Sequence, residues 1–252
     1  MNEGVGVVVG VTGTIGEAVA RRLLGRGVPV VGVARSAEAL SELAAEMPGI
    51  TPCQADIGSN DAVSTIRDAV TTAGYPVRIA VFAAGLPVRG SVDTIDPDLL
   101  AVGANIKIGG LVRLVRAVAD HLRVGSRIVT FAGSLGLEPT ATEAGPGAIN
   151  AGVLNLMRQL SKTYGPRGVT THTISPGPAD TPRLRRIVAA VAAEQGRDPA
   201  EVWAGYLAAN SLGRLPTVDE IAWAVEVLLA PEASVMHGSV LSLDAGGHHG
   251  IW

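Results

Sequence analysis

Short apolar runs alternate with amphipathic stretches along most of the chain. The runs are rich in valine and isoleucine, as buried strands are, and the stretches between them carry apolar side chains at helical spacing. This pattern predicts strands at residues 6–11, 28–34, 50–54, 78–83, 127–131, 169–174 and 240–243. It predicts helices at residues 15–26, 37–46, 61–72, 148–163 and 218–229, with a broken helical region at 99–122.

Alternating strands and helices indicate an α/β fold. Because the strands are continuously apolar, we expect both faces of the sheet to be covered, which is typical of parallel strands. Right-handed crossovers then give a Rossmann-type doubly wound, seven-stranded parallel sheet with helices on both faces. The chain of 252 residues has no linker or internal repeat, so we expect one domain over residues 1–252.

One segment, residues 178–212, interrupts this rhythm after the sixth strand. Long insertions in compact domains are often lids, so we expect a substrate lid here, with a surface helical hairpin as the alternative. The segment holds Trp203, Tyr206 and the arginines 183, 185 and 186. These residue types indicate a medium-sized, partly apolar small-molecule substrate, with an anionic group as one option.

Composition narrows the class of protein. Hydrophobic residues make up 47% of the chain and aromatic residues 3%, which favours a close-packed aliphatic core over disorder. The net charge of −3 and the lack of a basic stretch give no sign of a nucleic-acid partner. A single cysteine, Cys53, fits a reducing compartment. With no signal-peptide pattern and no membrane-spanning apolar run, we expect a cytoplasmic protein.

A glycine-rich turn joins the first strand to the first helix. Gly10, Gly13 and Gly16 allow a tight turn and close approach of a pyrophosphate, whose charge a helix N-terminus stabilises. The intervening Thr12, Thr14 and Ile15 belong to the same predicted cofactor site. The alternative is a purely structural glycine turn.

Four further motifs follow the glycine turn in order. They are Ala55-Asp56-Ile57, Ala83-Ala84-Gly85, the segment from Ser175 to Pro182, and Leu243-Asp244-Ala245-Gly246-Gly247. Together they resemble the short-chain dehydrogenase/reductase family over nearly the full chain, although that family usually has a glycine at the place of Thr14 and asparagines at the places of Phe82 and Ala83.

The resemblance implies the parts of a nicotinamide dinucleotide site. Asp56 and Ile57 would contact the adenine, and Ala83, Ala84 and Gly85 would line the groove after the fourth strand. Pro176, Gly177 and Thr181 would contact the nicotinamide end.

The end of the second strand bears on the choice of cofactor. An NAD site usually carries an acidic residue about 20 residues after the glycine turn, whereas this chain has Ala34-Arg35-Ser36. Arg35 can pair with a 2′-phosphate, so we expect NADP(H). The alternative is a solvated arginine.

The family's acid–base residues are missing. The resemblance implies a catalytic tyrosine, a lysine four residues later, a serine after the fifth strand and a relay asparagine. Here Pro146 and Asn150 stand at the tyrosine and lysine positions, and Gly133 stands at the serine position with Ser134 beside it. With Gly110 as the motif's glycine, Lys107 falls where the asparagine belongs; the alternative match is Asn105, whose spacing is two residues off.

We therefore expect Ser134, Asn150 and Lys107 to be the catalytic candidates. Ser134 would orient a carbonyl, and Asn150 would hold a water or the nicotinamide ribose; the alternatives are a turn serine and a solvated lysine. The loop acids Glu138 and Glu143 are solvated by default, with a catalytic role as the alternative. The histidines show no metal-ligand spacing, so no metal is expected.

Three functions stay open. The first is a carbonyl or ketone reductase with a non-standard proton source, the second is a non-redox cyclase, isomerase or dehydratase on the same scaffold, and the third is a non-catalytic binding protein. The family packs helices beside strand five across a twofold axis, so we expect a homodimer or homotetramer. Its predicted interface comprises Leu111, Leu114, Val115, Val118 and residues 153–160.

Overall fold

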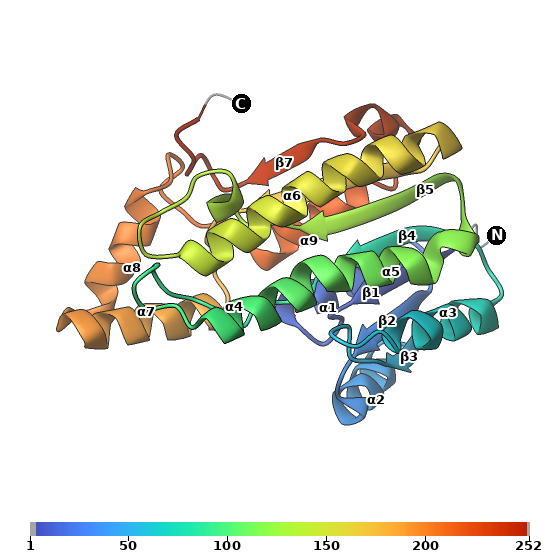
Figure 1. The fold of residues 1–252 in the computed structure, drawn as a ribbon, viewed down its shortest axis with the longest axis horizontal. Helices are drawn as coiled ribbons and strands as arrows, with labels where there is room; N and C mark the ends of the chain where they lie inside the picture. Colours follow the sequence, from blue (N-terminus) through green and yellow to red (C-terminus); the bar gives the residue numbers. More distant parts are fainter. Residues whose placement is uncertain (1–3, 251–252) are drawn as a thin grey trace.

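A single twisted sheet of seven strands organises the molecule (Figure 1). The computed structural model describes residues 4–250. The spatial order is β3-β2-β1-β4-β5-β6-β7, and every neighbouring pair runs parallel. The strands are β1 (Val5–Val9), β2 (Val30–Ala34), β3 (Ile50–Gln54), β4 (Val77–Phe82), β5 (Leu122–Phe131), β6 (Thr170–Pro176) and β7 (Val240–Leu243). The predicted seven-stranded doubly wound sheet is thus confirmed.

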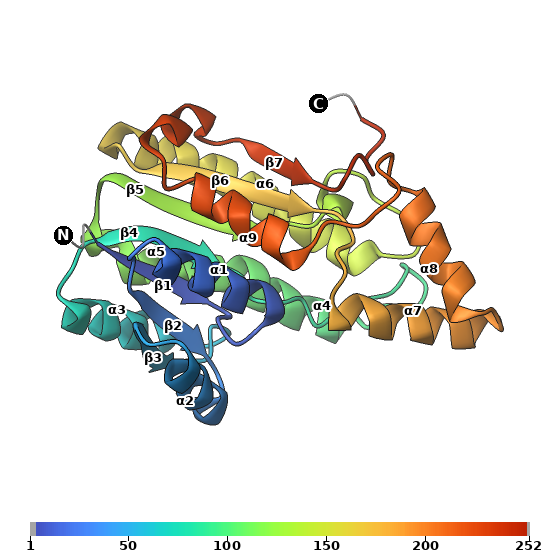
Figure 2. The same ribbon diagram turned by 180° about the vertical axis from the view of Figure 1, so that it is seen from behind.

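Helices cover both faces of the sheet, and each face has its own apolar cluster (Figures 1 and 2). Side chains alternate along each strand, so Val7 joins one cluster and Val8 joins the other. The first face carries α3 (Ala62–Ala73), α4 (Pro97–Ala104), α5 (Gly110–Val118) and α6 (Ala144–Tyr164). The second carries α1 (Thr14–Gly25), α2 (Ala37–Glu46) and α9 (Val218–Val227). No helix within residues 4–250 is both long enough and apolar enough to cross a membrane.

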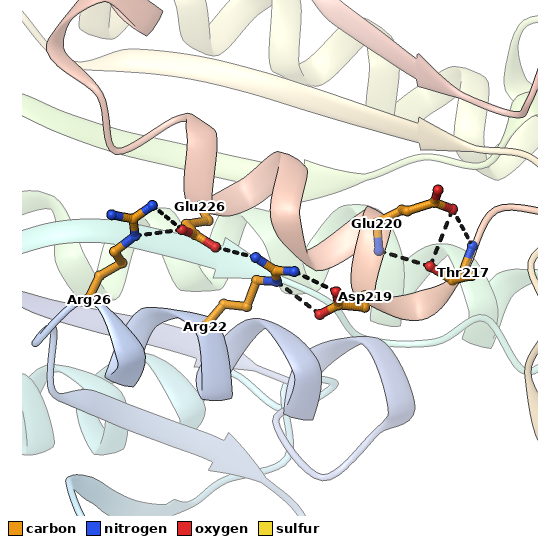
Figure 3. A network of polar contacts seen from close by, with 6 residues as sticks. All are labelled: Arg22, Arg26, Thr217, Asp219, Glu220 and Glu226. Atoms are coloured by element: carbon orange, nitrogen blue, oxygen red, sulfur yellow. Dashed lines mark hydrogen bonds and ion pairs between the residues drawn. The ribbon is translucent and has the colours of Figure 1, made fainter.

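Ion pairs join α1 to α9, although the two helices lie some two hundred residues apart in the chain (Figure 3). The Arg22 guanidinium donates to Asp219, with 3.0 Å from Nε to Oδ1, and to Glu226. Arg26 donates to the same Glu226. The glycine turn precedes α1, so these contacts fix the helix whose N-terminus borders the predicted phosphate site.

The predicted break in the 99–122 helical region is a π-helical turn. It spans Asn105–Gly109 between α4 and α5, and such turns are frequent at functional sites. It places Lys107 toward the interior.

The α5 side chains do not form the expected subunit interface. Leu111, Leu114, Val115 and Val118 are at most 5% exposed, because they pack on the sheet. The predicted interface is wrong for these four residues. In the 153–160 run, Val153 and Met157 are buried in the same cluster.

The 178–212 segment forms a helical hairpin. Its helices are α7 (Pro182–Gln195) and α8 (Pro199–Ala208). They enclose a separate apolar cluster of Leu184, Val188, Ala192, Val202 and Leu215, with Trp203 and Tyr206 packed against it. The hairpin lies beyond the carboxyl ends of the strands, beside the loop that leads into α4 (Figures 1 and 2).

Candidate active site

A groove of about 390 Å³ opens at the carboxyl ends of β1, β2 and β4. The chain leaves β1 toward β2 on one side and later returns to β4 on the other, and this reversal is where doubly wound folds bind ligands. Nine of the predicted cofactor residues line the groove: Gly10, Thr12, Gly13, Arg35, Asp56, Ile57, Ala83, Ala84 and Gly85.

The glycine turn fits a pyrophosphate because side chains are sterically excluded from it. Gly10 has a φ of +82°, and a Cβ there would lie 2.9 Å from the backbone of Ala83. A Cβ on Gly16 would overlap the carbonyl oxygen of Gly10. Gly13, the N-cap of α1, provides no side-chain cap, which leaves the amides of Thr14 and Ile15 available to an anion.

The adenosine end of the groove offers one cation and one carboxylate. Arg35 is exposed at the end of β2, and its guanidinium makes no hydrogen bond to any residue from 4 to 250. The next residue, Ser36, caps α2 by accepting from the Ala39 amide at 3.2 Å. Asp56 accepts from the Gly58 amide at 2.9 Å through one oxygen, so its other oxygen can accept from an adenine amine.

The predicted nicotinamide contacts lie where β6 leads into α7. Pro176 is the last residue of β6. A Cβ on Gly177 would lie 2.8 Å from the Cβ of Asp244, so the C-terminal turn excludes any side chain at that position. Thr181 caps α7, its hydroxyl accepting from the Leu184 amide at 3.1 Å, and its O–H can still donate.

Asn150 packs against the glycines on either side of Ser134, in the turn that follows β5. The side-chain Nδ2 atom of Asn150 is 3.4 Å from the position that a Cβ on Gly133 would take. Asn150 is only 7% exposed, yet its side chain makes no hydrogen bond within the described part of the chain. Ser134 begins a 3-10 turn, and its hydroxyl is likewise unpaired with any described residue. Buried amides are normally satisfied, so Asn150 is suited to bind a ligand or a water.

Pro146, which the family resemblance places at the tyrosine position, has no side-chain proton to donate. It is buried in the first turn of α6, where a missing N–H costs nothing.

Lys107 is the buried cation of the site. It is 6% exposed, and its Nζ donates to the Ala84 carbonyl oxygen at 3.0 Å. Nζ also lies 5.7 Å from the centre of the Phe82 ring. Burial, helped by the charge of Arg183, lowers the pKa of Lys107 to about 8. The alternative of a solvated surface lysine is wrong.

The two loop acids have other partners. Glu143 pairs with Arg89. Glu138 accepts from the amides of His249 and Gly250, both at 2.7 Å, and so holds the C-terminal tail against the loop after β5. Within residues 4–250, no three His, Cys, Asp or Glu side chains form a potential metal site.

Sequence reasoning placed Arg183 in the hairpin but not among the site residues. It lines the groove, together with Leu86, Pro87 and Ile106. Its Nη2 donates to the Leu86 carbonyl oxygen at 2.9 Å. Its position two residues after Thr181 was the available signal, but a partner in a loop almost a hundred residues away cannot be read from spacing.

Comparison with known proteins agrees with this geometry. The family described as enoyl-(acyl carrier protein) reductase matches residues 10–248. The chain belongs to the short-chain dehydrogenase/reductase family. Members of this family include oxidoreductases, and the relatives that match the chain carry such names.

Three similar proteins illustrate the relationship. Cis-4-hydroxycyclohexanecarboxylate dehydrogenase of Sinomonas cyclohexanicum is 28% identical over 251 residues, covering 97% of this chain and 96% of that protein. An uncharacterized short-chain type dehydrogenase/reductase of Sinorhizobium fredii is 33% identical over 150 residues, 60% of this chain and 26% of that protein, so the match spans only about a quarter of that relative. The crystal structure of YwfH, described as an NADPH-dependent reductase involved in bacilysin biosynthesis, superposes with a TM-score of 0.89 at 18% identity, covering 99% of this chain and 100% of that one.

Proposed function

We propose that this short-chain dehydrogenase/reductase is an NADP(H)-dependent ketone reductase in which Lys107 supplies the proton. The carrying observation is the buried ammonium beside Ala84, at the edge of the cofactor groove. An efficient general acid has a pKa near the working pH, and burial brings the pKa of Lys107 to about 8. The family relationship supports redox chemistry, since cis-4-hydroxycyclohexanecarboxylate dehydrogenase bears the name of an alcohol-oxidising enzyme.

Each candidate has a role in this proposal. The nicotinamide supplies the hydride when it is bound. Ser134 donates a hydrogen bond that orients the carbonyl, and Lys107 delivers the proton taken up by the carbonyl oxygen. Asn150 uses its free amide to hold the nicotinamide ribose or a water, in place of a lysine. General acid catalysis contributes typically 10²–10⁴-fold, which is what Lys107 would have to provide.

The preference for NADP(H) rests on Arg35. No carboxylate follows β2 to repel a 2′-phosphate, and the free guanidinium can make charge-assisted bonds to one. The Ser36 hydroxyl accepts from the Ala39 amide in the cap of α2 and keeps its own O–H free to donate beside the arginine.

Isotope transfer tests the proposal. NADPH deuterated at C4 of the nicotinamide, in each stereochemical form, is incubated with a panel of ketones and the products are analysed by mass spectrometry. We expect one deuterium at the carbinol carbon from one form only. Product without deuterium would favour the non-redox cyclase, isomerase or dehydratase, and tight NADPH binding without turnover of any compound would favour the binding protein.

The 178–212 hairpin and the quaternary structure complete the proposal. The hairpin closes over the substrate as a lid, because one of its residues, Arg183, already reaches the groove. We also propose a symmetric homodimer or homotetramer, since most soluble oligomers are symmetric. Light scattering that shows only monomer at micromolar concentration would refute the assembly.

A further inference from the structure

Three cations from different elements meet on one short loop. The loop follows β4, and its carbonyl oxygens bind Lys107 at Ala84 and Arg183 at Leu86. The third cation, Arg89, belongs to the loop itself and pairs with Glu143 at the start of α6. Lys107 comes from the π-helical turn beneath the loop, and Arg183 comes from the first turn of α7.

The charges at this loop do not balance. Glu143 is paired with Arg89, whereas Lys107 and Arg183 have only carbonyl partners within residues 4–250. Burial and then the charge of Arg89 lower the pKa of Arg183, and the charge of Glu143 offsets this only in part. Cations held together without a counter-ion cost free energy that a bound anion recovers. A cleft with such an excess of charge attracts and orients anions.

Arg183 lines the groove beside the loop that follows β4. The Nη1 atom is 3.8 Å from the position of a Cβ on Gly85, on the loop that runs away from the glycine turn. Its place in the first turn of α7 adds the positive end of the helix dipole. The glycine turn and Arg35 line the same groove and offer the cofactor's phosphates donors of their own.

We propose that Arg183 binds a carboxylate of the substrate, so that the substrate is an oxo acid and not a neutral ketone, while Lys107 stays free to serve the ketone oxygen. This inference rests on the proposed reductase function but is tested by binding alone. The free oxygen of Glu143 is buried without a partner among the described residues. It would accept a hydrogen bond from a hydroxyl on the same compound.

Binding of a matched pair of ketones tests the proposal. 4-Acetylbenzoate and 4-acetylbenzamide are titrated calorimetrically into the full chain saturated with NADP⁺, at low and at high salt. We expect the carboxylate to bind at least tenfold more tightly than the amide at low salt, with a smaller ratio at high salt. In Arg183→Gln the ratio falls below threefold, and in Arg183→Lys it is intermediate, since lysine keeps the charge and loses the planar fork.

Arg197→Gln is the matched control. It removes the same charge at the tip of the hairpin, between α7 and α8, where Arg197 pairs with Glu201 and donates to Gln195, and it leaves the tenfold ratio unchanged. Circular dichroism verifies that all three variants fold.

Two results would overturn the inference. Equal binding of the carboxylate and the amide to the wild type would refute the carboxylate site, even if the enzyme reduces ketones. An unchanged carboxylate preference in Arg183→Gln, together with at least tenfold weaker NADPH binding, assigns the guanidinium to the cofactor's pyrophosphate. Carboxylate preference without ketone turnover would leave the binding site standing and refute only the proposed reaction.

Discussion

The ammonium of Lys107 lies 3.0 Å from the carbonyl oxygen of Ala84, and no carboxylate in residues 4–250 lies within ion-pairing distance of it. A lysine in the interior normally has an acidic partner, because an unpaired buried charge is expensive. Here a backbone dipole and the face of Phe82 take that place. The result is a cation that can give up its proton near neutral pH.

The first prediction concerns the pH dependence of turnover. Since the protonated form of Lys107 is the acid, kcat/KM should be highest below pH 8 and fall as pH rises through its pKa of about 8. Lys107→Met should abolish this limb and lower kcat roughly 10²–10³-fold. Lys162→Met, which changes the only other lysine, at the exposed end of α6, is the control. An alkaline limb that persists in Lys107→Met would assign the proton to another group.

The second prediction separates Ser134 from its neighbours. Ser134→Ala should lower kcat at least tenfold while leaving the Kd of NADPH unchanged, because the unpaired hydroxyl lies at the end of β5 and not in the phosphate turn. Stopped-flow turnover and fluorescence titration measure the two quantities. Full activity in the alanine variant would leave Ser134 as a turn residue.

The third prediction concerns Arg35. NADPH should bind at least tenfold more tightly than NADH, and Arg35→Ala should remove the preference, because one charge-assisted contact contributes on the order of 1.4 kcal/mol. Arg21→Ala is the control, since its guanidinium pairs with Glu17 on the exposed side of α1. Equal affinities in the wild type would contradict the prediction.

The fourth prediction uses two glycines of α1. Gly16→Ala should weaken NADPH binding at least tenfold, because the new methyl group overlaps the Gly10 carbonyl oxygen and forces the turn open. Gly25→Ala should leave binding unchanged, since nothing lies within 4 Å of its Cβ. Calorimetric titration and the Tm of each variant distinguish a local change in the turn from general unfolding. Unchanged NADPH binding in Gly16→Ala would contradict the prediction, because it would show that the turn accommodates the methyl group.

The fifth prediction concerns acid stability. His172 is fully buried, and burial lowers its pKa from 6.5 to about 4. The unfolded chain takes up a proton as pH falls through 6.5 while the folded chain does not, so the free energy of unfolding drops between pH 6.5 and 4, by roughly 3 kcal/mol at most.

Urea titrations at pH 7.5 and pH 5 measure this loss. His172→Gln should reduce the difference between the two pH values, whatever it does to stability at pH 7.5. His249→Gln, at a side chain that is 92% exposed, should leave the difference as in the wild type. A wild-type difference retained in His172→Gln would refute the assignment.

Local sequence patterns predict most of the fold. The helix at 37–46 and the strand at 50–54 have the predicted bounds, because their periodicity and flanking residues agree. Helix α6 begins at Ala144 and not at 148, since Gly145 and Pro146 signal a break in sequence but are tolerated in a first turn.

The residues that were misplaced depend on contacts distant in the chain. Helical periodicity in the sequence does not reveal the extra residue of a π turn. The side of the helix on which Lys107 lies, buried or exposed, could therefore not be predicted. Apolar stripes look the same whether they cover a sheet or a second subunit, which is why Leu111 and Leu114 were assigned to an interface. The catalytic candidates came from motif spacing, while their burial and free hydrogen-bonding groups came from packing.

The apolar cluster inside the α7–α8 hairpin has a consequence for engineering. Its members come from within the hairpin except for Leu215, which lies on the returning chain. A graft that exchanges residues 178–212 with the equivalent segment of a relative would therefore separate the hairpin from part of its own core. Extending the exchange through Leu215, up to Thr217 where α9 is capped, transfers the cluster intact. The boundaries of a functional chimera are thus set by packing inside the transplanted module.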